Sequence, residues 1–151
     1  MAFSYFTALG SRNYRTGHIG RLSQKGNVRS FRKNKYNAHP TLIDGKSFPS
    51  MGEASLYAQL KFREKIGEIK DLSCYPTVRL SAADISWKID MQYYCIKRDC
   101  MVYAEFKGFE TERYRLVKRL YAVYGKEILE VYKANKRGVY LDETIKPRGA
   151  L

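Results

Sequence analysis

Two neighbouring strand-like segments, residues 85–95 and 101–107, constrain the fold more than any other feature of the chain. Apolar and polar residues alternate along the first segment, as they do in a strand with one buried face. A tight turn centred on residues 97–98 would pair the two segments as a hairpin and set Asp90 directly opposite Glu105, with Cβ atoms about 5 Å apart. Lys-Arg is poor turn chemistry, so the alternation of side chains is the main support for this register.

Asp90, Glu105 and Lys107 form a D-x14-E-x-K pattern on this hairpin. Glu105 and Lys107 point the same way because strand side chains repeat every two residues. Two close carboxylates repel each other unless a cation lies between them, and a hard divalent ion such as Mg2+ prefers oxygen ligands. Such an ion can activate water for phosphodiester hydrolysis, with the lysine stabilising charge on the phosphate. The alternative is ordinary exposed strand residues and a cross-strand ion pair worth less than about 1 kcal/mol.

Further elements can be expected on both sides of this hairpin. Asp44-Gly45 is a turn signal, and Ser50 with Glu53 fits a capping box in which Glu53 needs no other role. Gly52 in the first turn weakens the helix start. The expected elements are a hairpin at 41–48, a helix at 51–66 ended by Gly67, a strand near 74–80, a helix at 112–124 closed by Gly125, and a strand at 127–132. The tail reads as basic and polar. The second helix has a stripe expected to be buried: Tyr114, Val117, Leu120, Tyr121 and Tyr124. Together they predict an α/β (α+β) domain with a mixed central sheet flanked by helices.

The chain carries 28 Lys and Arg against 15 Asp and Glu, a net charge of +13, which favours a polyanionic partner such as DNA. Residues 1–40 form a basic N-terminal arm: eight Lys and Arg and no acid lie between Arg12 and Lys35. The arm is expected to contact phosphates, although a solvated or self-packed segment is the alternative. The candidate DNA-binding residues are Arg29, Arg32, Lys33 and Lys35 in the arm, and Arg115 and Lys118 in the second predicted helix.

No run approaches the roughly 18 apolar residues that span a bilayer, so no membrane association is expected. Three cysteines lack zinc-type spacing and read as reduced structural thiols. These features favour a cytoplasmic protein, in the host cell if a phage encodes it.

From Lys35 to about Val131 the sequence resembles the PD-(D/E)XK nuclease superfamily. Within it, the similarity is to a phage-associated group long catalogued as a domain of unknown function. The resemblance is carried by residues 35–38, 43–48, Ser50 with 53–54, 67–72 with Pro76, 107–109, 114–116 and 124–125. It implies a restriction-endonuclease-like core spanning 41–151 as a single domain. One departure is Ile89, where the superfamily often has proline.

The resemblance also implies roles for individual residues. Asp90 and Glu105 would bind Mg2+ (Mn2+ can substitute), Lys107 would be the catalytic lysine, and Glu53 would be an additional acid of the site. No small-molecule cofactor is implied. Small members of the superfamily include Holliday junction resolvases, which are usually homodimers, so branched DNA and a homodimer are expected. A nicking or non-specific DNA nuclease is the alternative enzyme, and a non-catalytic recombination or replication accessory protein is the alternative binder.

Overall fold

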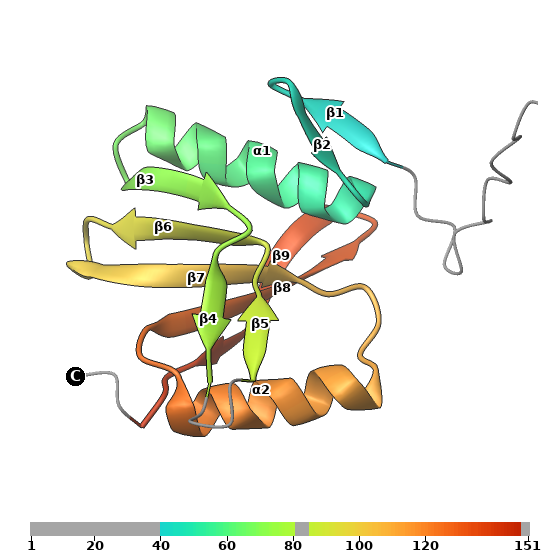
Figure 1. Cartoon of the computed structure of the whole chain (residues 1–151). Coiled ribbons are helices and arrows are strands. Elements are labelled where there is room, and N and C mark those ends of the chain that lie inside the picture. Colours follow the sequence, from blue (N-terminus) through green and yellow to red (C-terminus); the bar gives the residue numbers. More distant parts are fainter. Residues whose placement is uncertain (1–39, 81–84, 149–151) are drawn as a thin grey trace, which may run out of the picture. The chain divides into compact units, whose positions relative to one another are not determined.

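A five-stranded mixed sheet forms the centre of the protein, with strand order β3-β6-β7-β8-β9 (Figure 1). Its strands are β3 (Ile69–Cys74), β6 (Met91–Cys95), β7 (Cys100–Phe106), β8 (Ile128–Asn135) and β9 (Gly138–Ile145). Only β7 and β8 run parallel; the other three neighbouring pairs are antiparallel. A parallel pair needs a crossover connection, and the helix α2 (Glu112–Tyr124) supplies it.

The structure is a computed structural model that describes residues 40–80 and 85–148. The predicted arm, with Arg29, Arg32, Lys33 and Lys35, therefore lies outside the described residues apart from its last position. All described residues belong to one compact unit. In this part of the chain, no helix is long and apolar enough to cross a membrane.

The two helices cover opposite faces of the sheet, which gives three layers (Figure 1). The helix α1 (Met51–Lys65) buries Leu56, Tyr57 and Leu60 against one face. Tyr121 of α2 packs with Leu129 on the other face. The predicted α+β fold, a mixed sheet flanked by helices, is confirmed.

The start of α1 was predicted correctly from its capping residues. Ser50 is the N-cap, and its hydroxyl oxygen accepts a hydrogen bond from the Glu53 amide at 3.2 Å. The same hydroxyl donates to Glu53 Oε1 at 3.1 Å. The preceding hairpin, β1 (Thr41–Ile43) and β2 (Lys46–Phe48), is also confirmed. Its turn residues Asp44 and Gly45 both have positive φ, 50° and 71°, as a type I′ turn requires.

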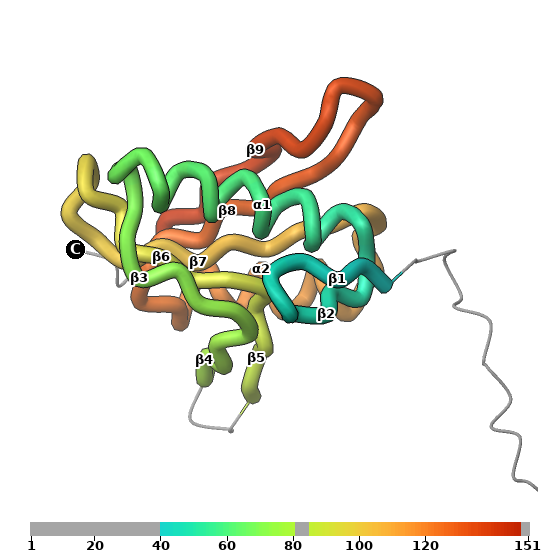
Figure 2. Tube along the Cα trace, turned by 90° about the horizontal axis from the view of Figure 1, so that it is seen from above, coloured from blue at the N-terminus to red at the C-terminus, as the bar shows by residue number. Residues whose placement is uncertain are grey.

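The segment 85–95 is not one strand, as its alternation predicted. It divides into β5 (Ser86–Lys88) and β6, because β5 pairs with β4 (Thr77–Arg79) in a separate two-stranded sheet. The strand predicted near 74–80 divides in the same way, at Tyr75 and Pro76. Tyr75 adopts a left-handed φ of 61°, which redirects the chain. Figure 2 shows the β4–β5 hairpin leaving the sheet on one side and the β8–β9 hairpin extending on the other.

The C-terminal third contains one strand that was not predicted and one side chain whose predicted burial was wrong. The polar tail is in fact the edge strand β9, whose residues are mostly exposed and so lack an apolar alternation. Tyr124 is 53 % exposed rather than part of the buried stripe, whereas Tyr114 and Tyr121 are buried as predicted. The three cysteines are unpaired, in agreement with the expectation of free thiols.

Candidate functional site

Asp90 and Glu105 lie opposite each other where β6 begins and β7 ends. The register pairs Met91 with Ala104, as predicted, so the preceding and following residues face each other. The Asp90 amide donates to Glu105 Oε2 at 3.3 Å, and the Phe106 amide donates to Asp90 Oδ2 at 2.8 Å. Each carboxylate is thus held by the backbone of the other strand, which fixes the pair without neutralising it.

This acidic pair is electrostatically unfavourable as it stands. Glu105 is only 4 % exposed and Asp90 is half-buried. Burial raises the pKa of Asp90, and the charges of Glu105 and Glu53 raise it further. Burial also raises the pKa of Glu105, although the nearby Lys107 ammonium lowers it part of the way back. Each carboxyl therefore resists ionisation unless more positive charge reaches the pair.

Lys107 contacts both the acidic pair and an aromatic ring. Its Nζ lies 3.3 Å from Glu105 Oε1 and 4.4 Å from the centroid of the Tyr114 ring. The structure thus brings Asp90, Glu105 and Lys107 together at one end of the sheet.

Glu53 joins this group from the first turn of α1. Burial raises the pKa of Glu53, while its hydrogen bond with Ser50 and the charge of Lys107 lower it. Its own charge contributes to the raised pKa of both Asp90 and Glu105. Capping the helix and facing the site are therefore compatible.

The close approach of α1 explains why a glycine occupies the first helical turn. A Cβ added at Gly52 would lie 2.0 Å from Cε1 of Phe106, the residue that follows Glu105. Gly52 weakens the helix locally but lets the start of α1 rest on the end of β7. That contact brings Glu53 to the acidic pair.

The oxygen donors of this group suit a hard divalent cation. Among the described residues, no three His, Cys, Asp or Glu side chains form a ready-made metal cluster. Mg2+ does not need one, because it is commonly held by one or two carboxylates together with waters and substrate phosphates. Asp90 and Glu105 could supply those carboxylates, with Glu53 as a neighbouring acid.

Another buried acid in the same sheet, Glu130, has hydrogen-bond donors that stabilise its negative charge. It accepts hydrogen bonds from Tyr93 and Tyr132 at 2.6 Å each and from Arg98 at 2.7 Å. Burial alone would raise its pKa, but these three donors bring the pKa of Glu130 below its ordinary value. The two carboxylates of the acidic pair share two backbone amides and the Lys107 ammonium as donors, and their pKa values stay above the ordinary value.

Tyr75 borders the site and was not anticipated from the sequence. Its hydroxyl is buried and has no hydrogen-bond partner among the described residues. Burial raises the pKa of Tyr75, and the charges of Glu53 and Asp90 raise it further. The residue before a proline is biased toward extended backbone, so the left-handed Tyr75 before Pro76 was not predictable from local pattern.

Arg115 and Lys118, predicted to bind DNA, differ in their availability. Lys118 is 19 % exposed and pairs with Glu143 at 2.8 Å and Glu110 at 3.6 Å. Arg115 is 60 % exposed, and its guanidinium lies 3.9 Å from the Glu110 carboxylate, which is a long distance for an ion pair. Arg115 thus remains open to a partner, whereas Lys118 is largely neutralised.

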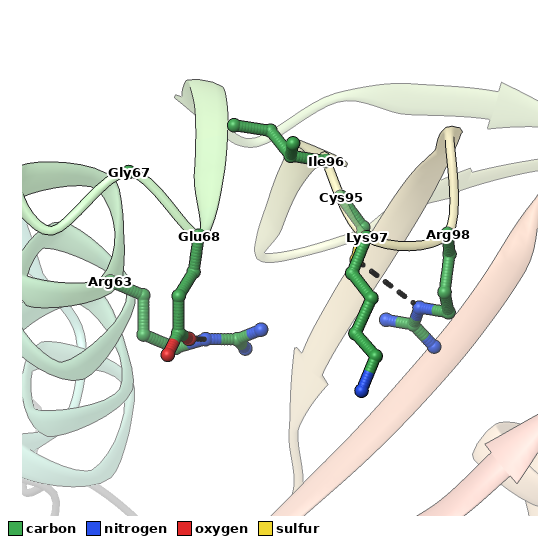
Figure 3. A pocket seen from close by; sticks show the side chains of 7 residues that line it. All are labelled: Arg63, Gly67, Glu68, Cys95, Ile96, Lys97 and Arg98. Carbon is green, nitrogen blue, oxygen red and sulfur yellow. Dashed lines mark hydrogen bonds and ion pairs between the residues drawn. The ribbon is translucent and has the colours of Figure 1, made fainter.

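Two cavities lie near the elements that carry the acidic pair, one close to Lys107 and the other far from it. One of about 480 Å³ includes Lys107 in its wall and lies between the β4–β5 hairpin and the start of α2. The other, of about 600 Å³, lies by the end of α1 and the β6–β7 turn (Figure 3). In the second, Arg63 pairs with Glu68 at 3.0 Å and Arg98 donates to Cys95 Sγ at 3.3 Å. It contains none of the predicted site residues.

Fold and site together define an α+β protein with a largely buried acidic pair beside a lysine. The chain belongs to the family described as protein of unknown function (DUF1064), whose model matches residues 33–137. The matched range contains Glu53, Asp90, Glu105 and Lys107 and ends before β9. No curated protein matches the chain.

Proposed function

We propose that the protein is a metal-dependent endodeoxyribonuclease of the PD-(D/E)XK type. Asp90 and Glu105 would hold Mg2+, for which Mn2+ can substitute, with Glu53 as a supporting acid. The observation that carries the proposal is the acidic pair: two facing carboxylates whose pKa values are raised by burial and by the charge of neighbouring acids, Glu105 and Glu53 for Asp90 and Glu53 for Glu105. Such a pair lowers the stability of the fold. Ionisable groups with strongly shifted pKa values are common at functional sites.

The side chains divide the chemistry between them. A bound divalent ion would polarise a phosphate oxygen and lower the pKa of a water molecule. Asp90 and Glu105 would fix its position, because backbone amides hold one oxygen of each. Lys107, 3.3 Å from Glu105, would orient the nucleophile or stabilise negative charge on the phosphate.

The proposed substrate is DNA, recognised by its phosphates. The net charge of +13 favours binding of a polyanion without regard to sequence. We propose branched DNA, of the Holliday junction type, cut by a homodimer, because two symmetric incisions require two sites and each chain has one. A nicking nuclease for ordinary duplex is the second candidate.

Cleavage assays with labelled four-way junctions and linear duplexes test this proposal. The full-length protein should cut in Mg2+ or Mn2+ and not in EDTA. Asp90→Asn and Glu105→Gln should abolish cleavage and keep DNA binding, since each removes one ligand charge and no basic residue. Lys107→Ala should lose cleavage, and Glu53→Gln should slow it by orders of magnitude with little change in melting temperature, because Gln also serves in a capping box.

Glu68→Gln is the matched control, because Glu68 is an exposed acid at the other cavity. It should leave cleavage unchanged. Wild-type rates in both Asp90→Asn and Glu105→Gln would remove the acidic pair from the site. Equal cutting of junction and duplex by the wild-type protein would favour the nicking nuclease.

A further inference from the structure

We propose that the cavity beside Lys107 receives one unpaired nucleotide of the DNA strand, next to the bond to be cut. The cavity occupies about 480 Å³, within the range of sites that enclose small molecules. The inference rests on the proposed function and extends it from DNA in general to DNA with an unpaired base at the site.

The lining has the composition of a nucleotide site. It combines positive charges, hydroxyl groups and aromatic rings, and none of the described residues that line it is Asp or Glu. Its charged and aromatic members are Lys88, Trp87, Lys107, Arg113 and Tyr114. Cations with hydroxyls suit a phosphate, while aromatic side chains suit a base, because every base has a face that can stack.

Two of the cations are available for a ligand. Within residues 40–80 and 85–148, neither Lys88 nor Arg113 forms an ion pair. Lys88 Nζ lies 4.6 Å from the Tyr75 ring centroid, so its position is set by an aromatic contact that leaves its charge uncompensated. Lys118, one turn further along α2, contrasts with them because two acids neutralise it.

Lys107 belongs to both the cavity and the acidic group. Its Nζ reaches Glu105 on one side and the Tyr114 ring on the other. A phosphate held near Lys107 and the acidic pair would therefore place a flanking nucleotide at the mouth of the cavity. Lys107 is therefore the side chain that the two sites share.

The aromatic side chains of the wall pack against one another. Trp87 packs edge-on against Tyr114 and Tyr121, with ring centroids 5.8 Å and 5.7 Å apart. A base stacked within a duplex cannot enter a recessed pocket without leaving the stack, and an already unpaired base does so at the lowest cost. The cavity thus selects branched or single-stranded DNA over intact duplex.

Trp87 is the only tryptophan of the chain, so its fluorescence reports directly on this cavity. The full-length protein in EDTA, which prevents cutting, is titrated with a short oligothymidylate and with a blunt duplex. Oligothymidylate should quench the emission, and the duplex should not, even where fluorescence anisotropy of labelled DNA shows that both bind. Lys88→Ala combined with Arg113→Ala should raise the half-quenching concentration about ten-fold, since the cavity then has two fewer cations to neutralise phosphates.

Arg119→Ala is the matched control, because Arg119 is an exposed arginine of α2 outside this cavity. It should leave quenching unchanged, and unperturbed emission of the free variants verifies that they are folded. Bound oligothymidylate without quenching, or equal quenching by the duplex, would overturn the inference even if the protein cuts DNA. If quenching depends on Lys88 and Arg113 but the protein cuts no DNA, the proposed function is refuted, while the inference that the cavity binds an unpaired nucleotide stands.

Discussion

At the scale of single residues, the acidic pair destabilises the metal-free fold. The pKa of Asp90 is raised in the folded state by burial and by Glu105. Ionising Asp90 therefore requires more free energy in the folded protein than in the unfolded chain. The penalty is absent below the ordinary carboxyl pKa and grows as the pH rises through the raised value. In EDTA, the protein should therefore lose stability between mildly acidic and mildly alkaline pH.

Asp90→Asn should reverse that trend. Asparagine keeps an oxygen that can accept from the Phe106 amide and removes the charge. We expect stability in EDTA at neutral or mildly alkaline pH to rise by at least about 1 kcal/mol, since one unit of pKa shift corresponds to about 1.4 kcal/mol and the pKa of Asp90 is raised to about 8. Thermal unfolding at several pH values measures the gain.

Glu130→Gln is the control of opposite sign, because Tyr93, Tyr132 and Arg98 favour the ionised form of Glu130. Its melting temperature should fall. A lower melting temperature for Asp90→Asn in EDTA would contradict the electrostatic account of the acidic pair.

At the scale of elements, capping and turn residues correctly predicted the helix and the hairpin that depend on them. The helix α1 followed from Ser50 and Glu53, and the first hairpin from Asp44-Gly45. The break between β5 and β6 did not follow, because pairing with distant strands ended the strand while the alternation continued. The strand β9 was not predicted, because the residues of an exposed edge strand need not alternate between apolar and polar. The register of Asp90 and Glu105 was predictable from the strand pattern, whereas the proximity of Glu53 to them, which depends on tertiary packing, was implied only by the family resemblance.

The contact between Gly52 and Phe106 supports a prediction for α1. Gly→Ala in a helix normally stabilises by about 1 kcal/mol. Gly52→Ala should instead destabilise by about 1–3 kcal/mol, because the new methyl group would overlap the Phe106 ring. Chemical denaturation measures the change.

Phe106→Leu makes room for that methyl group and provides the control. Gly52→Ala should cost less in the Phe106→Leu background than in the wild type. An equal loss in both backgrounds would show that crowding against Phe106 is not the cause.

At the scale of the whole molecule, three layers place the acidic pair where the sheet meets the start of α1. Composition predicts a polyanionic partner, but it cannot say which cations would contact phosphates. The homodimer stays a prediction from the symmetry of the proposed substrate. The basic arm lies outside the described residues, and its role is likewise predicted from sequence alone.

Replacing Arg29, Arg32, Lys33 and Lys35 by glutamine in the full chain tests the arm. The log–log slope of duplex binding against salt should flatten by about 0.9 for each phosphate that the arm no longer neutralises. Lys118→Gln should change the slope little, because Glu143 and Glu110 already neutralise that lysine. An unchanged slope in the arm variant would mean that its charges do not meet phosphates.

The position of the acidic pair on two interior strands bears on which insertions the chain can accept. The strand β6 is bonded to β3 and β7, and β7 to β6 and β8, so neither can slide without breaking ladders on both sides. Sliding by one residue would also turn Glu105 to the opposite face. The turn at residues 96–99 therefore does not need good turn chemistry. Over evolutionary time this turn can change in length and composition as long as Arg98 still reaches the buried Glu130, while the two strands that it joins cannot shift.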